Sequence, residues 1–221
     1  MDFRKYSAFL PQRRGPRATT CALPIALSLA FLAAGCSSQS SPTASAPATQ
    51  TGASGFAGAA LPPGPRPPAV TLSDQAGRRV SLAAPEGRVS ILAFLYTSCG
   101  AACTVIAQQI RGALDDLGGT VPVLIVSADP AADTPASARA FLSRVGLRSR
   151  VRYLTGSRAQ LAAAWRAFHV VPPSAGRAAF ARSAPVYVLD RAGRPRVIFQ
   201  LEQLTPESLA HDVRAVQRER R

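Results

Sequence analysis

An apolar run from Val89 to Tyr96 passes directly into a segment with helical periodicity, and this junction constrains the fold more than any other feature of the sequence. Eight residues without a charge predict a central strand that is buried on both faces. The apolar positions of the following segment recur at spacings of four, four and three, at Ile106, Ile110, Leu114 and Leu117, before Gly118-Gly119 ends the helix. A strand of this kind needs helices to cover it, which indicates an α/β architecture.

The rest of the chain beyond residue 68 alternates strands and helices in the same way. Further strands are predicted at Ala69–Leu72, Arg79–Leu82, Val121–Ser127, Val151–Leu154, Val186–Leu189 and Pro195–Phe199. Further helices are predicted to begin at Thr134-Pro135, at the capping pair Ser157 and Gln160, and at Thr205-Pro206. Turn residues at Asp74–Gly77 and Asp190–Gly193 indicate two hairpins. This order predicts an α/β fold of thioredoxin-like topology, with a mixed central sheet flanked by helices and an extra N-terminal hairpin.

Residues 1–35 have the pattern of an export signal. A basic segment ends at Arg17, and an apolar stretch follows from Ala22 to Ala34. As a helix this stretch spans roughly 20 Å, which is less than the ~30 Å hydrocarbon core of a membrane. The segment at the end of this stretch, Leu32-Ala33-Ala34-Gly35-Cys36, resembles the bacterial lipobox. We therefore expect Cys36 to be lipidated and the domain to face the periplasm or extracytoplasmic space from a membrane; the alternative is an ordinary cleaved signal with a free Cys36.

Residues 36–67 are expected to form a disordered tether. No charged residue occurs between Ser37 and Pro65, and Ser, Ala, Pro, Thr and Gly dominate. Such a stretch buries too little apolar surface to offset the entropy of ordering. The predicted organisation is thus a signal peptide at 1–35, a tether at 36–67 and one folded domain at 68–221.

The formal net charge of +14 does not indicate a nucleic-acid-binding protein. The arginines are spread along the domain and lack the interleaved aromatic residues that such proteins use. A solvated basic surface, with anionic lipid headgroups as the candidate ligand, is the favoured interpretation.

Cys99 and Cys103 lie where the buried strand passes into the helix, and they are the cysteines left for chemistry after export. Cys21 is removed with the signal, and Cys36 is occupied by lipid. Backbone N–H groups and the positive end of the helix dipole stabilise a thiolate at this position. A spacing of four brings both sulfurs to one side of the first turn, where they can form a disulfide or bind Cu(I), which prefers sulfur ligands. Zinc would need further ligands that the mature chain does not supply.

Several segments together resemble the Sco/SenC family, thioredoxin-fold proteins associated with assembly of the copper site of cytochrome oxidase. They are Thr71–Gly77, Phe94–Thr97 before the C-x-x-x-C, Ala107–Gln109, Val126–Pro135, Leu154–Ser157 and Tyr187–Gly193. The resemblance covers about Pro68 to Val216. It implies that Cys99 and Cys103 act as a redox dithiol and as Cu(I) ligands. It also implies a partner, either the copper-bearing subunit of the oxidase or another exported thiol protein.

The sequence departs from the family pattern at three positions. Gly100 and Thr104 stand where a proline typically follows each cysteine, and Arg182 stands where the family has its third copper ligand, a histidine. A guanidinium at that position would repel Cu(I) and favour the thiolate form of the cysteines. The two histidines of the chain, His169 and His211, are assigned ordinary roles at a helix end and on a solvated surface.

Two acidic residues, Asp129 and Asp133, are assigned to turns and caps around Pro130 and Thr134 rather than to the rim of the site. Three hypotheses remain for the function. The first is a Sco-type protein that delivers Cu(I) or reduces partner cysteines. The second is a copper-independent thiol–disulfide oxidoreductase, and the third is a non-catalytic thioredoxin-fold binding module. The sequence does not decide whether the chain is an enzyme.

Overall fold

The computed structural model describes residues 54–62, 64, 66–67, 69–82, 87–119, 121–173, 180 and 183–219. The expected signal peptide, the expected lipidation site Cys36, the part of the expected tether up to residue 53, and Arg182 lie outside the described residues. Within the described ranges, no helix combines the length and the apolarity needed to cross a membrane. The elements below all belong to one compact unit, Ser45–Arg221.

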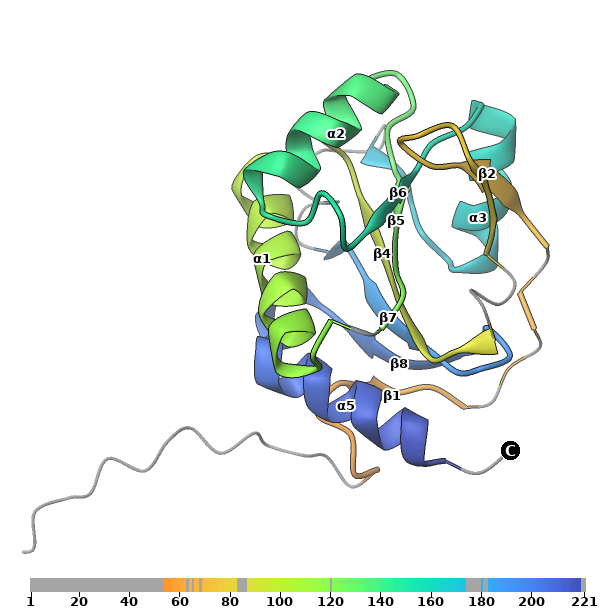
Figure 1. Cartoon of the computed structure of the whole chain (residues 1–221). Coiled ribbons are helices and arrows are strands. Elements are labelled where there is room, and N and C mark those ends of the chain that lie inside the picture. Colours follow the sequence, from red (N-terminus) through yellow and green to blue (C-terminus); the bar gives the residue numbers. More distant parts are fainter. Residues whose placement is uncertain are drawn as a thin grey trace, which may run out of the picture. The chain divides into compact units, whose positions relative to one another are not determined.

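A six-stranded mixed sheet forms the centre of this unit, as predicted (Figure 1). In spatial order its strands are β1 (Ala59–Ala60), β8 (Pro195–Phe199), β7 (Val186–Leu189), β4 (Ser90–Leu95), β5 (Val123–Ser127) and β6 (Arg152–Leu154). The strands β4, β5 and β6 run parallel to one another, whereas β7 is antiparallel to β4. All six residues of β4 are buried, which agrees with the near-continuous apolar run from which a central strand was predicted.

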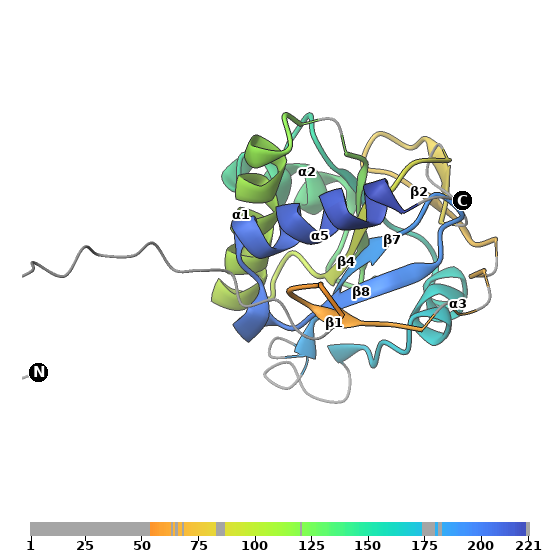
Figure 2. The same cartoon turned by 90° about the horizontal axis from the view of Figure 1, so that it is seen from below.

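Helices cover both faces of the sheet. They are α1 (Ala101–Asp116), α2 (Pro135–Arg144), α3 (Arg158–Ala167) and α5 (Pro206–Arg218), with a short 3-10 helix, η3, at Leu201–Gln203. Figures 1 and 2 show α1, α2 and α5 on one face and α3 on the other. The caps read from the sequence are present: Thr134, Ser157 and Thr205 each accept a hydrogen bond from the backbone amide three residues later.

The predicted N-terminal hairpin is also present, as β2 (Thr71–Ser73) and β3 (Arg79–Ser81). Its turn and the turn between β7 and β8 have the same construction, Asp-x-Ala-Gly-Arg. In the first, the Asp74 carboxylate accepts hydrogen bonds from the Ala76 and Arg78 amides and from the Arg78 guanidinium. In the second, Asp190 accepts the corresponding bonds from Ala192 and Arg194. Burial raises the pKa of each carboxyl group, but these hydrogen bonds outweigh it and leave the pKa below its ordinary value.

The chain joins the sheet earlier than the sequence predicted. Residues up to 67 were expected to be a disordered tether, yet β1 pairs with the edge strand β8. The buried Asp212 carboxylate on α5 accepts hydrogen bonds from the Ala57 and Gly58 amides, each at 2.9 Å. A Cβ at Gly58 would meet the Val197 side chain at 2.7 Å, so glycine allows this close approach. The hydrogen bonds use backbone atoms of this segment, which its side-chain composition does not reveal, and Phe56 and Leu61 pack against the core beside them.

Candidate redox site

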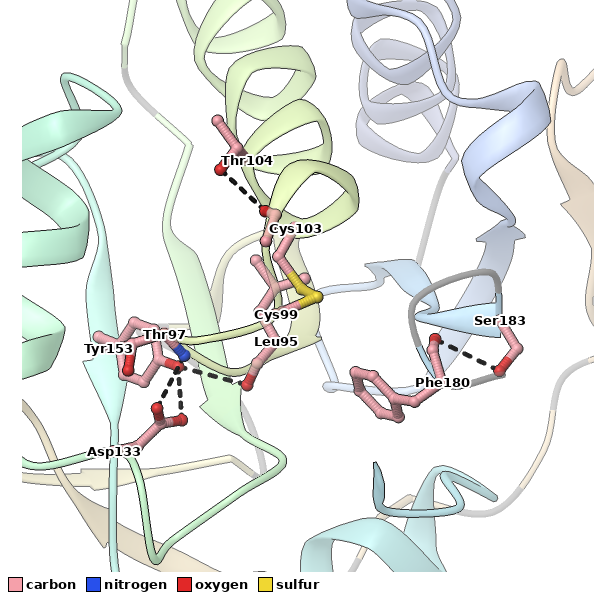
Figure 3. Close-up of a disulfide and its surroundings, with 10 residues drawn as sticks. Leu95, Thr97, Cys99, Cys103, Thr104, Asp133, Tyr153, Phe180 and Ser183 are labelled. Atoms are coloured by element: carbon pink, nitrogen blue, oxygen red, sulfur yellow. Dashed lines mark hydrogen bonds between the residues drawn. A yellow bond between two sulfur atoms is a disulfide. The ribbon is translucent and has the colours of Figure 1, made fainter. Parts of the chain in front are cut away.

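Cys99 and Cys103 are joined in a disulfide at the start of α1, with 5.7 Å between their Cα atoms (Figure 3). Cys99 lies just before the N-cap residue Gly100, and Cys103 lies in the first helical turn. The two cysteines therefore act as one unit, although Cys99 precedes the helix instead of sharing its first turn. Cys103 is completely buried, whereas Cys99 is half-buried. Only one end of the disulfide is thus open to an incoming thiol.

The backbone conformation at positions 100 and 104 differs from what a proline would adopt or allow. Gly100 has φ 83° and ψ −144°, a conformation almost confined to glycine. Proline, with φ fixed near −65°, cannot adopt it. Thr104 donates twice to the Gly100 carbonyl, from its amide at 3.3 Å and from its hydroxyl at 3.0 Å. A proline at position 104 would remove the first of these donors.

A buried carboxylate, Asp133, fixes the segment that leads from β4 to Cys99. Its Oδ1 accepts a hydrogen bond from the Thr97 amide at 2.8 Å. Its Oδ2 accepts from the Ser127 hydroxyl and the Tyr153 hydroxyl, both at 2.7 Å. Asp133 is only 5% exposed and connects the ends of β4, β5 and β6. The backbone two residues before Cys99 is therefore held to β5 and β6 through Asp133, and Figure 3 shows its bonds to Thr97 and Tyr153.

This role of Asp133 was missed in the sequence, where capping and turn formation were favoured. Burial and the neighbouring charge of Asp133 raise the pKa of Tyr153 well above its usual value, so Tyr153 stays protonated and can donate. Asp129 does form a turn, since its carboxylate accepts from the Ala131 amide at 3.2 Å. The available signal was position: Asp133 follows a buried strand that ends in the polar Ser127.

Aromatic side chains pack on the sheet beyond the segment that carries the cysteines. The rings of Tyr96 and Phe180 lie 5.5 Å apart, and both side chains are buried. The Trp165 indole donates to the Ser127 carbonyl at 3.0 Å. Tyr187 donates to the Phe168 carbonyl at 2.7 Å, and burial raises the pKa of Tyr187 to about 12. These contacts bury aromatic side chains against the sheet, and in the case of Trp165 and Tyr187 they satisfy a polar atom of the ring system with a backbone carbonyl.

The histidines do not join the cysteines. Among the described residues there is no group of three His, Cys, Asp or Glu side chains that could hold a metal ion. His169 is exposed at the end of α3 and has a left-handed backbone, φ 54°. His211 lies on α5, where its Nδ1 is 2.8 Å from Asp212. The described residues therefore supply two sulfurs after reduction and no third ligand, so they fit a redox pair and do not complete a copper site.

A mixed sheet whose central strand leads to a C-x-x-x-C disulfide at the start of a helix defines a thioredoxin-like disulfide protein. The chain belongs to the SCO1/SenC family, since the model of that family matches residues 67–218. This confirms both the fold and the family that the sequence predicted.

Solved structures agree with this assignment. BsSco, a member of the Sco family of cytochrome c oxidase assembly proteins with a disulfide switch, is 20% identical, with a TM-score of 0.59 over 73% of this chain and 99% of that one. Copper-bound ScoI of Bradyrhizobium japonicum is 26% identical, with a TM-score of 0.51 over 71% and 99%. Copper-bound yeast Sco1 is 19% identical, with a TM-score of 0.58 over 71% and 96%. No curated protein matches the chain.

The extent of these matches also bears on how the domain folds. The match with BsSco covers 99% of the BsSco chain but 73% of the present chain. The BsSco chain therefore contains little besides this domain, and it folds without a counterpart of the remaining residues. The compact unit that begins at Ser45 is therefore expected to fold on its own.

Proposed function

We propose that this chain is an exported, membrane-tethered Sco/SenC protein that acts in assembly of the copper site of a respiratory cytochrome oxidase. Its chemistry is exchange of the Cys99–Cys103 disulfide with the cysteines of the copper-bearing subunit. The observation that carries the proposal is the pairing of one accessible and one buried cysteine in a single disulfide at the start of α1. The lipobox ending in Cys36 supports the tether.

In the reducing direction, the Cys99 thiolate attacks a disulfide of the partner and one partner thiolate leaves. The Cys103 thiolate then attacks the Cys99 sulfur, and the second partner thiolate leaves. Two electrons pass to the partner, which takes up two protons, and this chain becomes the disulfide seen here. An exported dithiol reductant must then restore Cys99 and Cys103 before the next cycle. The positive end of α1 stabilises the thiolates in both steps.

The test uses the unit from Ser45 in its reduced form and the oxidised copper-bearing subunit. Thiol labelling should show one partner disulfide reduced for each Cys99–Cys103 disulfide formed. The Cys99→Ser/Cys103→Ser variant is the control and should give no exchange. If cells carrying that double variant assemble the oxidase normally, the dithiol has no role there and the binding-module hypothesis replaces this proposal.

Delivery of Cu(I) as cargo is the second candidate, because reduction of the disulfide yields two adjacent soft donors. Copper is bound in the Bradyrhizobium japonicum relative. Anaerobic Cu(I) titration of the reduced unit should be compared with the Arg182→His variant. Copper delivery requires binding by the unsubstituted chain, and a gain of affinity in the variant would show that the arginine weakens the site. Absence of binding in both would reject copper delivery and leave copper-independent thiol–disulfide exchange.

A further inference from the structure

The amino ends of β4, β5 and β6 surround an arginine-lined cavity of about 390 Å³. Because these three strands are parallel, their first residues meet at one edge of the sheet. The arginines that line the cavity are Arg78, Arg88, Arg148, Arg150 and Arg152. None of the described residues lining it is acidic or aromatic. From beside the cavity, Asp74 forms an ion pair with Arg78, and Asp115 forms one with Arg150.

A second basic cavity lies at the same edge of the sheet. It has a volume of about 450 Å³ and is lined by Arg66, Arg191, Arg194 and Arg196. Two acidic residues also line it, and they form ion pairs, Asp190 with Arg194 and Glu219 with Arg196. The turn between β7 and β8 forms part of it, and β7 ends opposite the first residue of β4. Gly87 lines this cavity and Arg88 lines the first, so the two adjoin along the chain. We call the nine arginines of both cavities the arginine face.

The arginine face and the disulfide lie at opposite ends of the central strand. Arg88 precedes β4 by two residues, and Cys99 follows its last residue, Leu95, by four. The six residues of β4 span roughly 20 Å. A ligand on the arginine face therefore leaves Cys99 free to meet a partner.

We infer that the arginine face binds the phosphate groups of anionic phospholipids and holds the domain on the membrane with its disulfide directed away from the lipid. Guanidinium groups match phosphate oxygens in a forked geometry. A face with two adjoining basic cavities suits a surface of repeated phosphates. The absence of aromatic side chains among the described lining residues disfavours a single-stranded nucleic acid, which needs stacking platforms. The biological use of this contact rests on the proposed tether at Cys36.

The test measures binding of the unit from Ser45 to vesicles of phosphatidylcholine alone and to vesicles that also contain phosphatidylglycerol. Arg88 and Arg148 are both exposed, so Arg88→Gln/Arg148→Gln should retain the fold. That pair should weaken binding to the anionic vesicles by about 30-fold, since each basic residue near such a surface contributes about fivefold. The matched control is Arg158→Gln/Arg166→Gln on the exposed side of α3, which should change binding only slightly. The variant Arg88→Lys/Arg148→Lys should restore most of the binding.

Equal losses in both glutamine pairs would mean that net charge alone drives binding and would overturn the inference. Equal binding to neutral and anionic vesicles would do the same. Binding of inorganic phosphate without binding of vesicles would show a free-anion site and reject the lipid. The Cys99→Ser/Cys103→Ser variant should bind vesicles normally, so a failure of lipid binding and a failure of thiol exchange are separate outcomes.

Discussion

The Asp133 carboxylate accepts a hydrogen bond from the Thr97 amide at 2.8 Å, and this bond couples a buried charge to the segment that carries Cys99. The same carboxylate holds the hydroxyl groups of Ser127 and Tyr153. The disulfide therefore depends on the interior of the sheet for its position as well as on α1.

Replacement Asp133→Ala should lower the free energy of unfolding by about 3 kcal/mol, because three donors lose this acceptor and, of the three, the Tyr153 hydroxyl retains another, the Leu95 carbonyl at 3.3 Å. It should also change the rate at which a small dithiol reduces the Cys99–Cys103 disulfide. Urea unfolding and a thiol-release assay measure the two effects. Asp129→Ala is the control and should be milder, since Asp129 is only half-buried. Equal effects of the two substitutions would contradict a special role for Asp133.

The two cysteines should behave differently when replaced singly. With Cys103→Ser, the accessible Cys99 remains and should trap a stable mixed disulfide with an oxidised partner, because no second thiol resolves it. With Cys99→Ser, the remaining Cys103 is fully buried and should trap little or none. Non-reducing electrophoresis after reaction with the oxidised subunit distinguishes the two. Equal trapping would show that Cys103 becomes accessible during exchange.

Replacement Gly100→Ala should destabilise the oxidised protein by about 1–3 kcal/mol through backbone strain at its positive φ. No atom lies within 4 Å of the added Cβ, so steric overlap is not the reason. Gly118→Ala is a matched control, since Gly118 also has a positive φ and an open surrounding. Thermal unfolding should show both losses, but only Gly100→Ala should alter the rate of disulfide reduction. An unaltered rate of disulfide reduction in Gly100→Ala would show that the backbone conformation at Gly100 does not affect the reactivity of the disulfide.

Alkaline solution should destabilise the fold through Tyr187. Its folded pKa of about 12 lies above the ordinary value of 10.0, so the unfolded chain releases this proton first. The stability that protonated Tyr187 contributes is complete below pH 10 and is lost as the pH rises toward 12. Tyr187→Phe should flatten this part of the profile of urea midpoints against pH, after correction for the lost bond to Phe168. An unchanged slope would mean that Tyr187 ionises freely in the folded state.

Acid should act through the two matching turns. Asp74 and Asp190 have folded pKa values below the ordinary value of 3.8, so the stability that they contribute is present above that pH and is lost as the pH falls through the folded values. Asp74→Asn and Asp190→Asn should each lower stability at neutral pH by about 1–2 kcal/mol and reduce the further loss on acidification. Urea unfolding across the acid range measures both. Parallel profiles for variant and parent would exclude these carboxylates as the cause.

Local patterns were sufficient for most of the fold. The near-continuous apolar run identified β4, the spacing of Ile106 and Ile110 identified α1, and Thr134 and Ser157 marked two helix starts. Each of these signals comes from residues that are close in sequence and whose periodicity depends on the element alone. The redox pair was recognised for the same reason, because strand end, cysteines and helix are contiguous.

The parts that were missed depend on contacts between distant residues. Asp133 and Thr97 are 36 residues apart, and nothing near either residue indicates the bond. Asp212 meets Ala57 across 155 residues, so the early start of the sheet at β1 had no local signal. His169 adopts a left-handed backbone that glycine more often provides at a helix end. Pairings of this kind are set by the assembled fold.

The bonds from Ala57 and Gly58 to Asp212 have a mechanical consequence. A pulling force that enters the domain through its N-terminal side reaches these bonds and the two-residue strand β1 before it reaches β4 or α1. Because β1 lies at the sheet edge, it can peel away from β8 while the central strands keep their pairing. The domain can thus yield to tension at its N-terminal side while Cys99 and Cys103 keep their positions at the start of α1.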